Sequence, residues 1–325
     1  MTASRVLAVD SGGSGLRVAL ADVSAPRRPE TLASQEPVRT GGSGIDAGHL
    51  LEQLLPMARA LLDRAGGGGE VSAVAIGAAG MGTLGGQLRA ELPAALGESL
   101  GVDRLALAAD AVTAYAGALG QRPGAVVAAG TGLIALGTDL SAWQRADGWG
   151  HLLGDSGGGA WIGRAGLDAA LRAHDGRRGG SAALLAAMES AFGPAQELPA
   201  KLYPRTDRPA VLASFAPEVA RCAAGGDAVA ADILARAAGH IAESASAVCP
   251  PAGQVALTGG LLKMGDPLLV PLRAELASQL PSAGQVAAAG DPLDGALLIA
   301  AALAQDALRL PRHPTLLYVP AEQGR

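Results

Sequence analysis

The chain has 325 residues, of which 49% are hydrophobic and only 2% aromatic, and its net charge is −5 at pH 7. This length suits two domains of ordinary size with buried cores. The acidic balance and the scarcity of aromatic rings argue against a nucleic-acid-binding face. Two cysteines, Cys222 and Cys249, are too few for a disulfide framework or a cysteine-rich metal site.

Neither a signal peptide nor an apolar run of about 20 residues, the length that spans a bilayer, is found in the sequence. We therefore expect a soluble, cytoplasmic protein with no membrane partner.

The first half of the sequence predicts a run of strands followed by alternating helices and strands. Apolar runs at Arg5–Val9 and Leu16–Asp22 predict two strands, which the glycine-rich turn Asp10–Gly15 joins. The elements expected after them are a strand at 31–37, a helix from Asp46 to Ala65, a strand at 71–76, a helix at 85–96, a strand at 105–109 and a helix at 110–119.

The second half begins as the first does, with a glycine turn at Gly130–Gly132 between the apolar runs Gly124–Ala129 and Leu133–Asp139. Helices are then expected at 156–173, 181–192, 208–224, 227–248, 266–279 and 292–308, and strands at 254–257 and 284–288. This order predicts an α/β architecture in two parts, with the boundary near Gly117–Gly124.

The turn after the first strand contains Ser11, Gly12, Gly13 and Ser14. Successive backbone N–H groups in such a turn form a concavity that binds anions. Asp10 at its start is a hard oxygen ligand of the kind that Mg²⁺ prefers. Taken alone, the turn is explained equally well as an ordinary tight hairpin.

Two further glycine turns each follow an apolar strand, namely Gly130-Thr131-Gly132 and Gly259-Gly260. Three such turns together predict phosphate-binding loops that hold one nucleotide from two domains.

Asp110 follows the apolar strand 105–109, where a helix begins. It is either the N-cap of that helix or a general base that faces a substrate hydroxyl.

The segment from Asp147 to Trp161 is rich in glycine and holds two of the three tryptophans. Trp149 between Gly148 and Gly150 presents a flat ring that suits a sugar or a base. Asp155, in the same loop as Gly158, is suited to accept hydrogen bonds from sugar hydroxyls, to cap the next helix, or both.

Two other enzyme classes are disfavoured. The run Gly154–Gly158 copies the nucleophile motif of trypsin-like proteases, but the region after it is strongly helical and no matching histidine segment precedes it. No G-x-x-x-x-G-K-[ST] loop of P-loop kinases occurs.

Taken together, these motifs resemble the N-acetylglucosamine kinase branch of the BadF/BadG/BcrA/BcrD ATPase family, within the actin, sugar-kinase and heat-shock-ATPase superfamily. The resemblance runs from Val6 to about Ala304, and its most specific piece is GWGHLLGDSGGGAWIGRAGLDAALRAHDG at 148–176.

The resemblance implies two ribonuclease-H-like domains, each a mixed five-stranded sheet flanked by helices, with ATP and Mg²⁺ in a cleft between them. One domain would comprise 1–118 with about 291–325, and the other 119–290. The implied roles are catalysis for Asp110, metal binding for Asp10, nucleotide binding for Ser11, Gly12, Gly13, Ser14, Gly130, Thr131, Gly132, Gly259 and Gly260, and sugar binding for Thr131, Gly148, Trp149, Gly150, Asp155 and Gly158.

The implied activity is ATP-dependent phosphorylation of an amino sugar, such as N-acetylglucosamine, glucosamine or a related cell-wall sugar, at the 6-hydroxyl. A homodimer is implied by the resemblance only. Alternatives are an ATPase activator that couples to a partner enzyme, a non-catalytic nucleotide-dependent regulator, and a kinase for another small hydroxyl compound. The sequence departs from the family at Leu133, Ile134, Ser156 and the loop Thr40–Gly44, where polar sugar contacts are usual.

Overall fold

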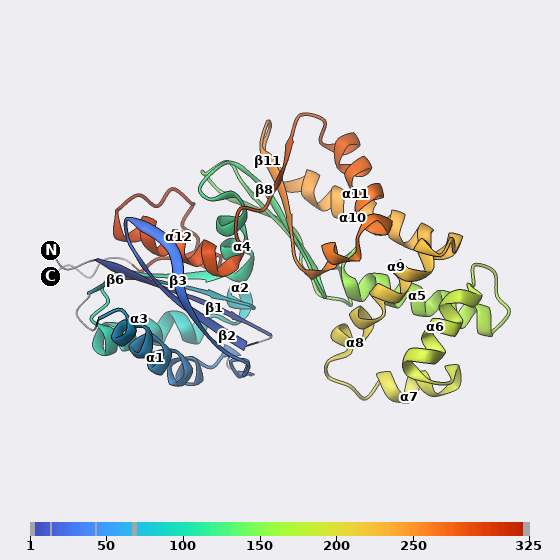
Figure 1. The fold of residues 1–325 in the computed structure, drawn as a ribbon, viewed down its shortest axis with the longest axis horizontal. Coiled ribbons are helices and arrows are strands. Elements are labelled where there is room, and N and C mark those ends of the chain that lie inside the picture. The colour runs from blue at the N-terminus through green and yellow to red at the C-terminus, as the bar shows by residue number, and fades with distance from the viewer. Residues whose placement is uncertain (1–3, 14, 43, 67–69, 321–325) are drawn as a thin grey trace. The chain divides into compact units, whose positions relative to one another are not determined.

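The computed structural model describes residues 4–13, 15–42, 44–66 and 70–320 and combines α-helices with two larger sheets (Figure 1). Its contacts divide the chain into two compact units. Unit 1 comprises Met1–Pro123, Thr138–Trp143 and Ala287–Arg325, and unit 2 comprises Gly124–Gly137 and Gln144–Val286. The domain limits expected from the sequence stay a prediction.

Unit 1 is built on a mixed sheet with the strand order β13-β7-β6-β1-β2-β3. Strands β1 to β3 pair antiparallel, whereas β1, β6 and β7 run parallel to one another. The short strand β13 pairs with β7 at the edge, so the sheet has six strands where five were expected. The strands are β1 (Arg5–Gly12), β2 (Gly15–Asp22), β3 (Ala25–Ser34), β6 (Val71–Ala78), β7 (Leu105–Ala109) and β13 (Leu317–Tyr318), and β4 (Thr40–Gly41) pairs with β5 (Gly44–Ile45) separately.

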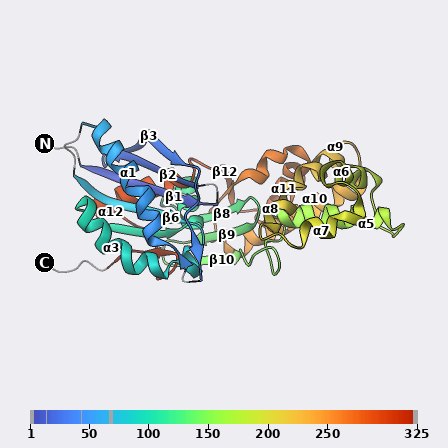
Figure 2. The same cartoon turned by 90° about the horizontal axis from the view of Figure 1, so that it is seen from below.

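The helices of unit 1 lie against this sheet (Figures 1 and 2). They are α1 (Ala47–Arg64), α2 (Met81–Leu84), α3 (Gly86–Leu100), α4 (Asp110–Leu119) and α12 (Pro292–Ala304). α12 packs against α4, β1 and β6, although it comes from the end of the chain, and α1 packs against β2 and α3. Asp46 caps α1 through its side chain, as expected.

The contact between α4 and α12 depends on glycine. A Cβ added to Gly295 on α12 would overlap the carbonyl oxygen of Thr113, and one added to Gly117 on α4 would overlap that of Asp291. The two helix backbones therefore approach more closely than any side chain at these positions would allow.

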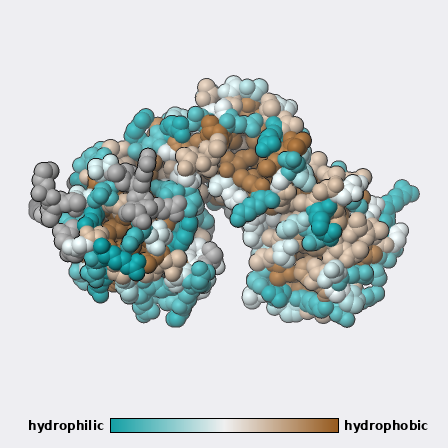
Figure 3. Space-filling model, viewed as in Figure 1, coloured by the Kyte–Doolittle hydropathy of each residue, from teal (hydrophilic) through white to brown (hydrophobic). Residues whose placement is uncertain are grey.

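Unit 2 repeats the strand order of unit 1, because its sheet β10-β9-β8-β11-β12 corresponds to β3-β2-β1-β6-β7. Its strands are β8 (Gly124–Ala129), β9 (Leu133–Thr138), β10 (Trp143–Asp147), β11 (Gln254–Thr258) and β12 (Gly284–Ala287). β8 and β11 are parallel neighbours, so their carboxyl ends lie at the same edge. Apolar residues, brown in Figure 3, gather over β8 and β11. The repeated order is the duplicated α/β fold that the sequence predicted.

The helices of unit 2 are α5 (Gly159–His174), α6 (Ala182–Phe192), α7 (Leu198–Leu202), α8 (Arg208–Ser214), α9 (Ala216–Ala224), α10 (Ala228–Val248) and α11 (Asp266–Gln279), with short 3₁₀ turns at Ala195–Glu197 and Gly260–Met264. The single helix predicted at 208–224 is two helices, because Pro217 in the first turn of α9 lacks an N–H group and Phe215 is buried at the break. β10 was not predicted. None of the helices in the described ranges combines the length and apolar character that crossing a bilayer requires.

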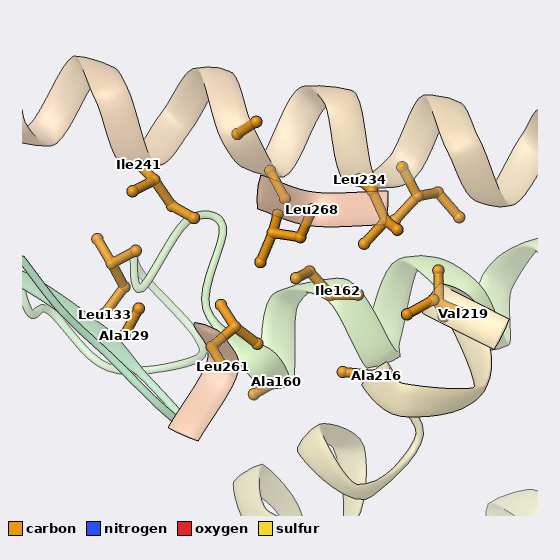
Figure 4. Packing of buried hydrophobic residues seen from close by; sticks show 14 of the residues in the cluster. Ala129, Leu133, Ala160, Ile162, Ala216, Val219, Leu234, Ile241, Leu261 and Leu268 are labelled. Carbon is orange, nitrogen blue, oxygen red and sulfur yellow. The ribbon is translucent and has the colours of Figure 1, made fainter. Parts of the chain in front are cut away.

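The core of unit 2 lies between its sheet and helices α5, α9, α10 and α11 (Figure 4). Leu133 on β9 and Ile241 on α10 belong to this cluster, as do Ile162 on α5 and Leu268 on α11. Each of these side chains is at most 2% exposed. The first turn of α5 is thus held by packing against several elements.

We predict that Gly295→Ala destabilises unit 1. The added methyl group meets backbone atoms that have little room to move, which typically costs about 1–3 kcal/mol. Each kcal/mol lost from the free energy of unfolding lowers the unfolding temperature by roughly 2–4 °C. The matched control is Gly239→Ala on α10, where no heavy atom lies within 4 Å of the added Cβ and helix propensity favours alanine. Equal unfolding temperatures for Gly295→Ala and the unchanged protein would contradict the packing described.

Candidate active site

The two acidic candidates of unit 1 lie at the ends of parallel strands. Asp10 is in β1, and Asp110 follows β7, with β6 between them. Because parallel strands end at the same edge of a sheet, both carboxylates are brought to that edge. Gly77 on β6, the strand between β1 and β7, has no side chain, and Thr113 fills the space that one would occupy. Cγ2 and Oγ1 of Thr113 lie 2.7 Å from where a Cβ on Gly77 would be.

Asp10 is a strand residue, not the first residue of a turn as the sequence predicted. β1 continues to Gly12, which places Asp10 directly opposite Arg17 on β2. Nε and Nη2 of Arg17 donate to Oδ2 of Asp10 at 3.0 and 2.5 Å, and Nη1 donates to Oδ2 of Asp291 at 2.9 Å. Arg17 therefore joins the first hairpin to the N-cap of α12.

Asp10 can serve as one ligand of Mg²⁺, but it cannot complete the coordination shell alone. Within the described ranges, no group of three or more His, Cys, Asp or Glu side chains is placed to hold a metal ion. Mg²⁺ in phosphoryl-transfer sites is bound by one or two carboxylates, with substrate phosphates and water completing its shell. A single carboxylate at Asp10 fits that mode.

Asp110 begins α4, and the N-cap position is taken by Ala109. Its Oδ1 accepts a hydrogen bond from the N–H of Ala111 at 2.9 Å, so the carboxylate does not cap the helix in the way the sequence allowed. Asp110 is exposed, yet protein atoms crowd around the carboxylate. This loss of hydration, together with the charge of Asp10, raises its pKa above the usual aspartate value, although the Ala111 hydrogen bond opposes the shift.

The first glycine turn is open on its outer side. A Cβ on Gly12 or Gly13 would meet no heavy atom within 4 Å. Ser11 is buried, and its carbonyl oxygen accepts a hydrogen bond from the N–H of Ala79. Ser14 lies outside the described residues. Gly12 and Gly13 thus leave space in which a phosphate group could lie against the backbone.

In unit 2, the turn Gly130–Gly132 is bound to the first turn of α5. The N–H groups of Gly159 and Ala160 each donate at 2.8 Å, to the carbonyl oxygens of Gly130 and Thr131 respectively. Within the turn, the N–H of Gly130 donates to the carbonyl of Gly132 at 3.0 Å. A Cβ on Gly130 would meet nothing within 4 Å, so this glycine also faces open space.

The Asp155 carboxylate lies directly against this turn. A Cβ on Gly132 would overlap Oδ2 of Asp155, so any larger residue at position 132 would have to displace that carboxylate. A Cβ on Gly158 would lie 2.8 Å from the carbonyl carbon of Gly132, so Gly158 is equally confined. The predicted sugar-binding carboxylate and the predicted phosphate-binding turn are therefore neighbours within one unit.

Asp147 closes the loop that contains Trp149. Its two carboxylate oxygens accept hydrogen bonds from the N–H groups of Asp155 at 2.6 Å and Ser156 at 2.8 Å. Asp147 and Asp155 both adopt the left-handed conformation, with φ of 58° and 54°. Left-handed backbone is costly for residues other than glycine and is found mainly where the surroundings enforce it, often at functional sites.

The electrostatic surroundings of Asp155 are mixed. Burial raises its pKa above the usual aspartate value, and the charge of Asp147 adds to this shift. The N–H of Gly150, 3.0 Å from Oδ1, and the charge of His151 act in the opposite direction. His151 therefore lies close enough to the candidate sugar-binding carboxylate for its charge to act on it.

Trp149 is 65% exposed, and the guanidinium of Arg145 lies over its ring, 4.3 Å from the centroid. A Cβ on Gly148 would lie 2.9 Å from Cδ1 of Ile134, so Ile134 borders this loop. Leu133, in contrast, is buried in the core, and its side chain is 2% exposed. Of the two neighbouring departures Leu133 and Ile134, Ile134 is the one that lies beside the loop.

The last glycine turn of unit 2 packs beside the end of β8. Gly259 has φ +106°, and a Cβ there would overlap the carbonyl oxygen of Ala129, the residue before Gly130. A Cβ on Gly260 would meet nothing within 4 Å. The two glycine turns of unit 2 are thus adjacent, and both have open space in front of them.

Three residues that sequence reasoning missed contribute to these arrangements, namely Arg17, Arg145 and Asp147. Arg17 is recognisable in hindsight, because a hairpin that pairs Gly12 with Gly15 also pairs Asp10 with Arg17. Arg145 and Asp147 both lie on β10, a strand that the sequence did not reveal.

The segment that contains these candidate sites matches a family model over most of the chain. The model of the BadF/BadG/BcrA/BcrD ATPase family matches residues 7–300. The chain belongs to this family. The family resemblance inferred from the motifs is confirmed.

Individual relatives of this BadF/BadG/BcrA/BcrD ATPase family member include sugar kinases. A segment of 69 residues is 42% identical to an N-acetylmuramic acid/N-acetylglucosamine kinase from Clostridium acetobutylicum, and it spans 21% of this chain and 22% of that protein. The structure of a candidate N-acetylglucosamine kinase from Chromobacterium violaceum is similar at a TM-score of 0.66 and 28% identity, over 91% of this chain and 98% of the other. The structure of a ROK family glucokinase from Streptomyces griseus, solved with glucose and AMPPNP, shares the fold at a TM-score of 0.55 and 19% identity, over 93% and 100%.

We predict that Asp147→Ala frees the loop between residues 147 and 156. The N–H groups of Asp155 and Ser156 lose their acceptor, and an unmade hydrogen bond at such a site costs about 1–3 kcal/mol. Hydrogen exchange at these two amides should accelerate roughly 5- to 100-fold. The control is Asp139→Ala, which removes an acceptor from the exposed turn at Ser141. Unchanged exchange at residues 155 and 156 would show that Asp147 does not hold the loop.

Proposed function

We propose that this protein transfers the γ-phosphoryl group of ATP to a hydroxyl of an amino sugar. N-acetylglucosamine, glucosamine and related cell-wall sugars are the proposed acceptors, with the 6-hydroxyl as the reacting group. The observation that carries the proposal is the contact between Asp155 and Gly132. It puts a carboxylate able to hold a sugar hydroxyl beside a glycine turn able to hold a phosphate.

The residues of unit 2 would bind both substrates. Gly130, Thr131 and Gly132 would receive the β- and γ-phosphates, while Gly259 and Gly260 would lie against adenosine. Asp155 would accept hydrogen bonds from sugar hydroxyls, with Gly148, Trp149, Gly150 and Gly158 bordering the ring. The similarity to two kinases of N-acetylated sugars, one of them matched over a short segment, supports this choice of acceptor.

The residues of unit 1 would supply the chemistry. Asp110 would accept the proton of the attacking hydroxyl, and its raised pKa makes the ionised carboxylate a stronger base than an ordinary aspartate. Asp10 would hold Mg²⁺, and Ser11, Gly12, Gly13 and Ser14 would contact phosphate. When bound, Mg²⁺ neutralises charge on the phosphates during transfer.

The remaining expectations belong to this proposal and rest on the family resemblance. They are a location in the cytoplasm, assembly as a homodimer, and two domains at 1–118 with 291–325 and at 119–290. They concern where and in what form the protein acts, and the proposed reaction does not depend on them.

The direct test is sugar-dependent release of ADP. We expect release above background with at least one of a panel of amino sugars, neutral hexoses and muropeptide sugars, because the carboxylate proposed to hold the sugar, Asp155, lies against the turn proposed to hold phosphate. Phosphorylated product identified by mass spectrometry would give the position of transfer. ATP hydrolysis that no sugar stimulates would overturn the kinase proposal and favour an ATPase activator.

We predict that Asp110→Asn lowers kcat by roughly 10²–10⁴-fold, because the amide cannot accept the hydroxyl proton. ATP binding, measured by calorimetry, should remain close to that of the unchanged protein. The control is Asp168→Asn on α5, an exposed partner of Arg172. If Asp110→Asn abolished ATP binding instead, its role would lie with the nucleotide.

A further inference from the structure

Arg145 occupies a defined place beside the proposed acceptor site. It lies on β10 two residues before Asp147, the residue that accepts the N–H groups of Asp155 and Ser156. Its guanidinium covers part of Trp149, and the next residue, Gly150, donates its N–H to Asp155. Arg145 is thus linked to the candidate sugar-binding carboxylate through one short loop of unit 2.

The contact with Trp149 orders the guanidinium without using its hydrogen-bond donors. A guanidinium over an aromatic face is attracted by the π-system, so its N–H groups stay available for another partner. Among the described residues, no hydrogen bond or salt bridge ties Arg145 to a protein acceptor. The side chain is also exposed, so a ligand can reach these donors.

The two carboxylates of this loop, Asp147 and Asp155, already accept hydrogen bonds from backbone N–H groups. Asp147 accepts two backbone N–H groups, and His151 lies close enough to Asp155 for its charge to act on that carboxylate. Within the described part of the chain, Arg145 beside this loop forms no ion pair with a carboxylate. A ligand in the acceptor site can supply one.

The position of Arg145 in the sheet favours the acceptor over adenosine as that ligand. β10 is the edge strand, and β9 and β8 separate it from β11, after which Gly259 and Gly260 follow. We infer that Arg145, held against Trp149, binds an acidic group on the acceptor, so that the enzyme prefers an amino sugar carrying a carboxylate to its neutral counterpart. This inference rests on the proposed function and adds the residue that selects the substrate.

N-acetylglucosamine and N-acetylmuramic acid form a matched pair, because the second carries an added ether-linked carboxylic acid. With the unchanged enzyme we expect kcat/KM to be higher for the acid than for the neutral sugar. Arg145→Gln should lower kcat/KM for the acid about 10- to 100-fold, mainly through KM, because it removes charge-assisted hydrogen bonds. KM for the neutral sugar and for ATP should stay within about twofold, and Arg145→Lys should keep part of the preference.

Sugar binding without ATP gives a second readout that does not need turnover. We expect the fluorescence of Trp149 to change on titration with N-acetylmuramic acid, with a Kd about 10- to 100-fold weaker in Arg145→Gln. Trp149→Phe identifies which tryptophan reports. The control is Arg236→Gln. It removes the guanidinium that lies over Trp161, outside this loop, and should leave the Kd of both sugars unchanged.

The outcomes separate the two proposals. If both sugars are phosphorylated with equal kcat/KM and Arg145→Gln changes neither, the inference fails and the kinase proposal stands. An increase in KM for ATP in Arg145→Gln would assign Arg145 to the nucleotide phosphates. That result would also overturn the inference that Arg145 binds the acceptor. If no sugar is bound or phosphorylated, the proposed function fails and the inference fails with it.

Discussion

The absence of a side chain at Gly132 is the constraint on which the candidate site of unit 2 depends. It lets the Asp155 carboxylate lie against the turn 130–132, and the same turn is held by two N–H groups from the first turn of α5. Backbone hydrogen bonds thus join the turn to the helix, and the N–H of Gly150 holds the Asp155 carboxylate. Because α5 is itself packed against α6, α8, α9 and α10, the core of unit 2 fixes the position of this candidate site.

The loop around Trp149 depends in turn on Asp147. Two aspartates in left-handed conformation are unfavourable by roughly 1–2 kcal/mol each. The hydrogen bonds from Asp155 and Ser156 to Asp147 offset that cost and define the path of the loop. The exposed Trp149 ring lies in this loop, with the guanidinium of Arg145 over it.

Unit 1 shows how distant parts of the chain are joined at one sheet edge. Asp291 caps α12 with Oδ1 and accepts from Arg17 with Oδ2, so the last helix and the first hairpin share a carboxylate. Such partly exposed ion pairs contribute only about 0–1 kcal/mol to stability. Their consequence is mainly geometric, because they set the orientation of Asp10 near Asp110, while the close glycine contacts of α4 and α12 provide the packing.

The sequence by itself determined the family, the repeated α/β order and most elements, because apolar periodicity, caps and glycine turns are local signals. It identified α1 with its cap at Asp46, and it identified Asp110, Asp155 and the three glycine turns as the residues to examine. It did not reveal β10 or the break at Phe215, since an exposed edge strand has weak periodicity and the break depends on burial. Only the tertiary structure decided that Asp155 touches Gly132, that Arg17 holds Asp10 and that Arg145 covers Trp149. These contacts join residues whose proximity depends on strand pairing, register and packing, which no local pattern in the sequence specifies.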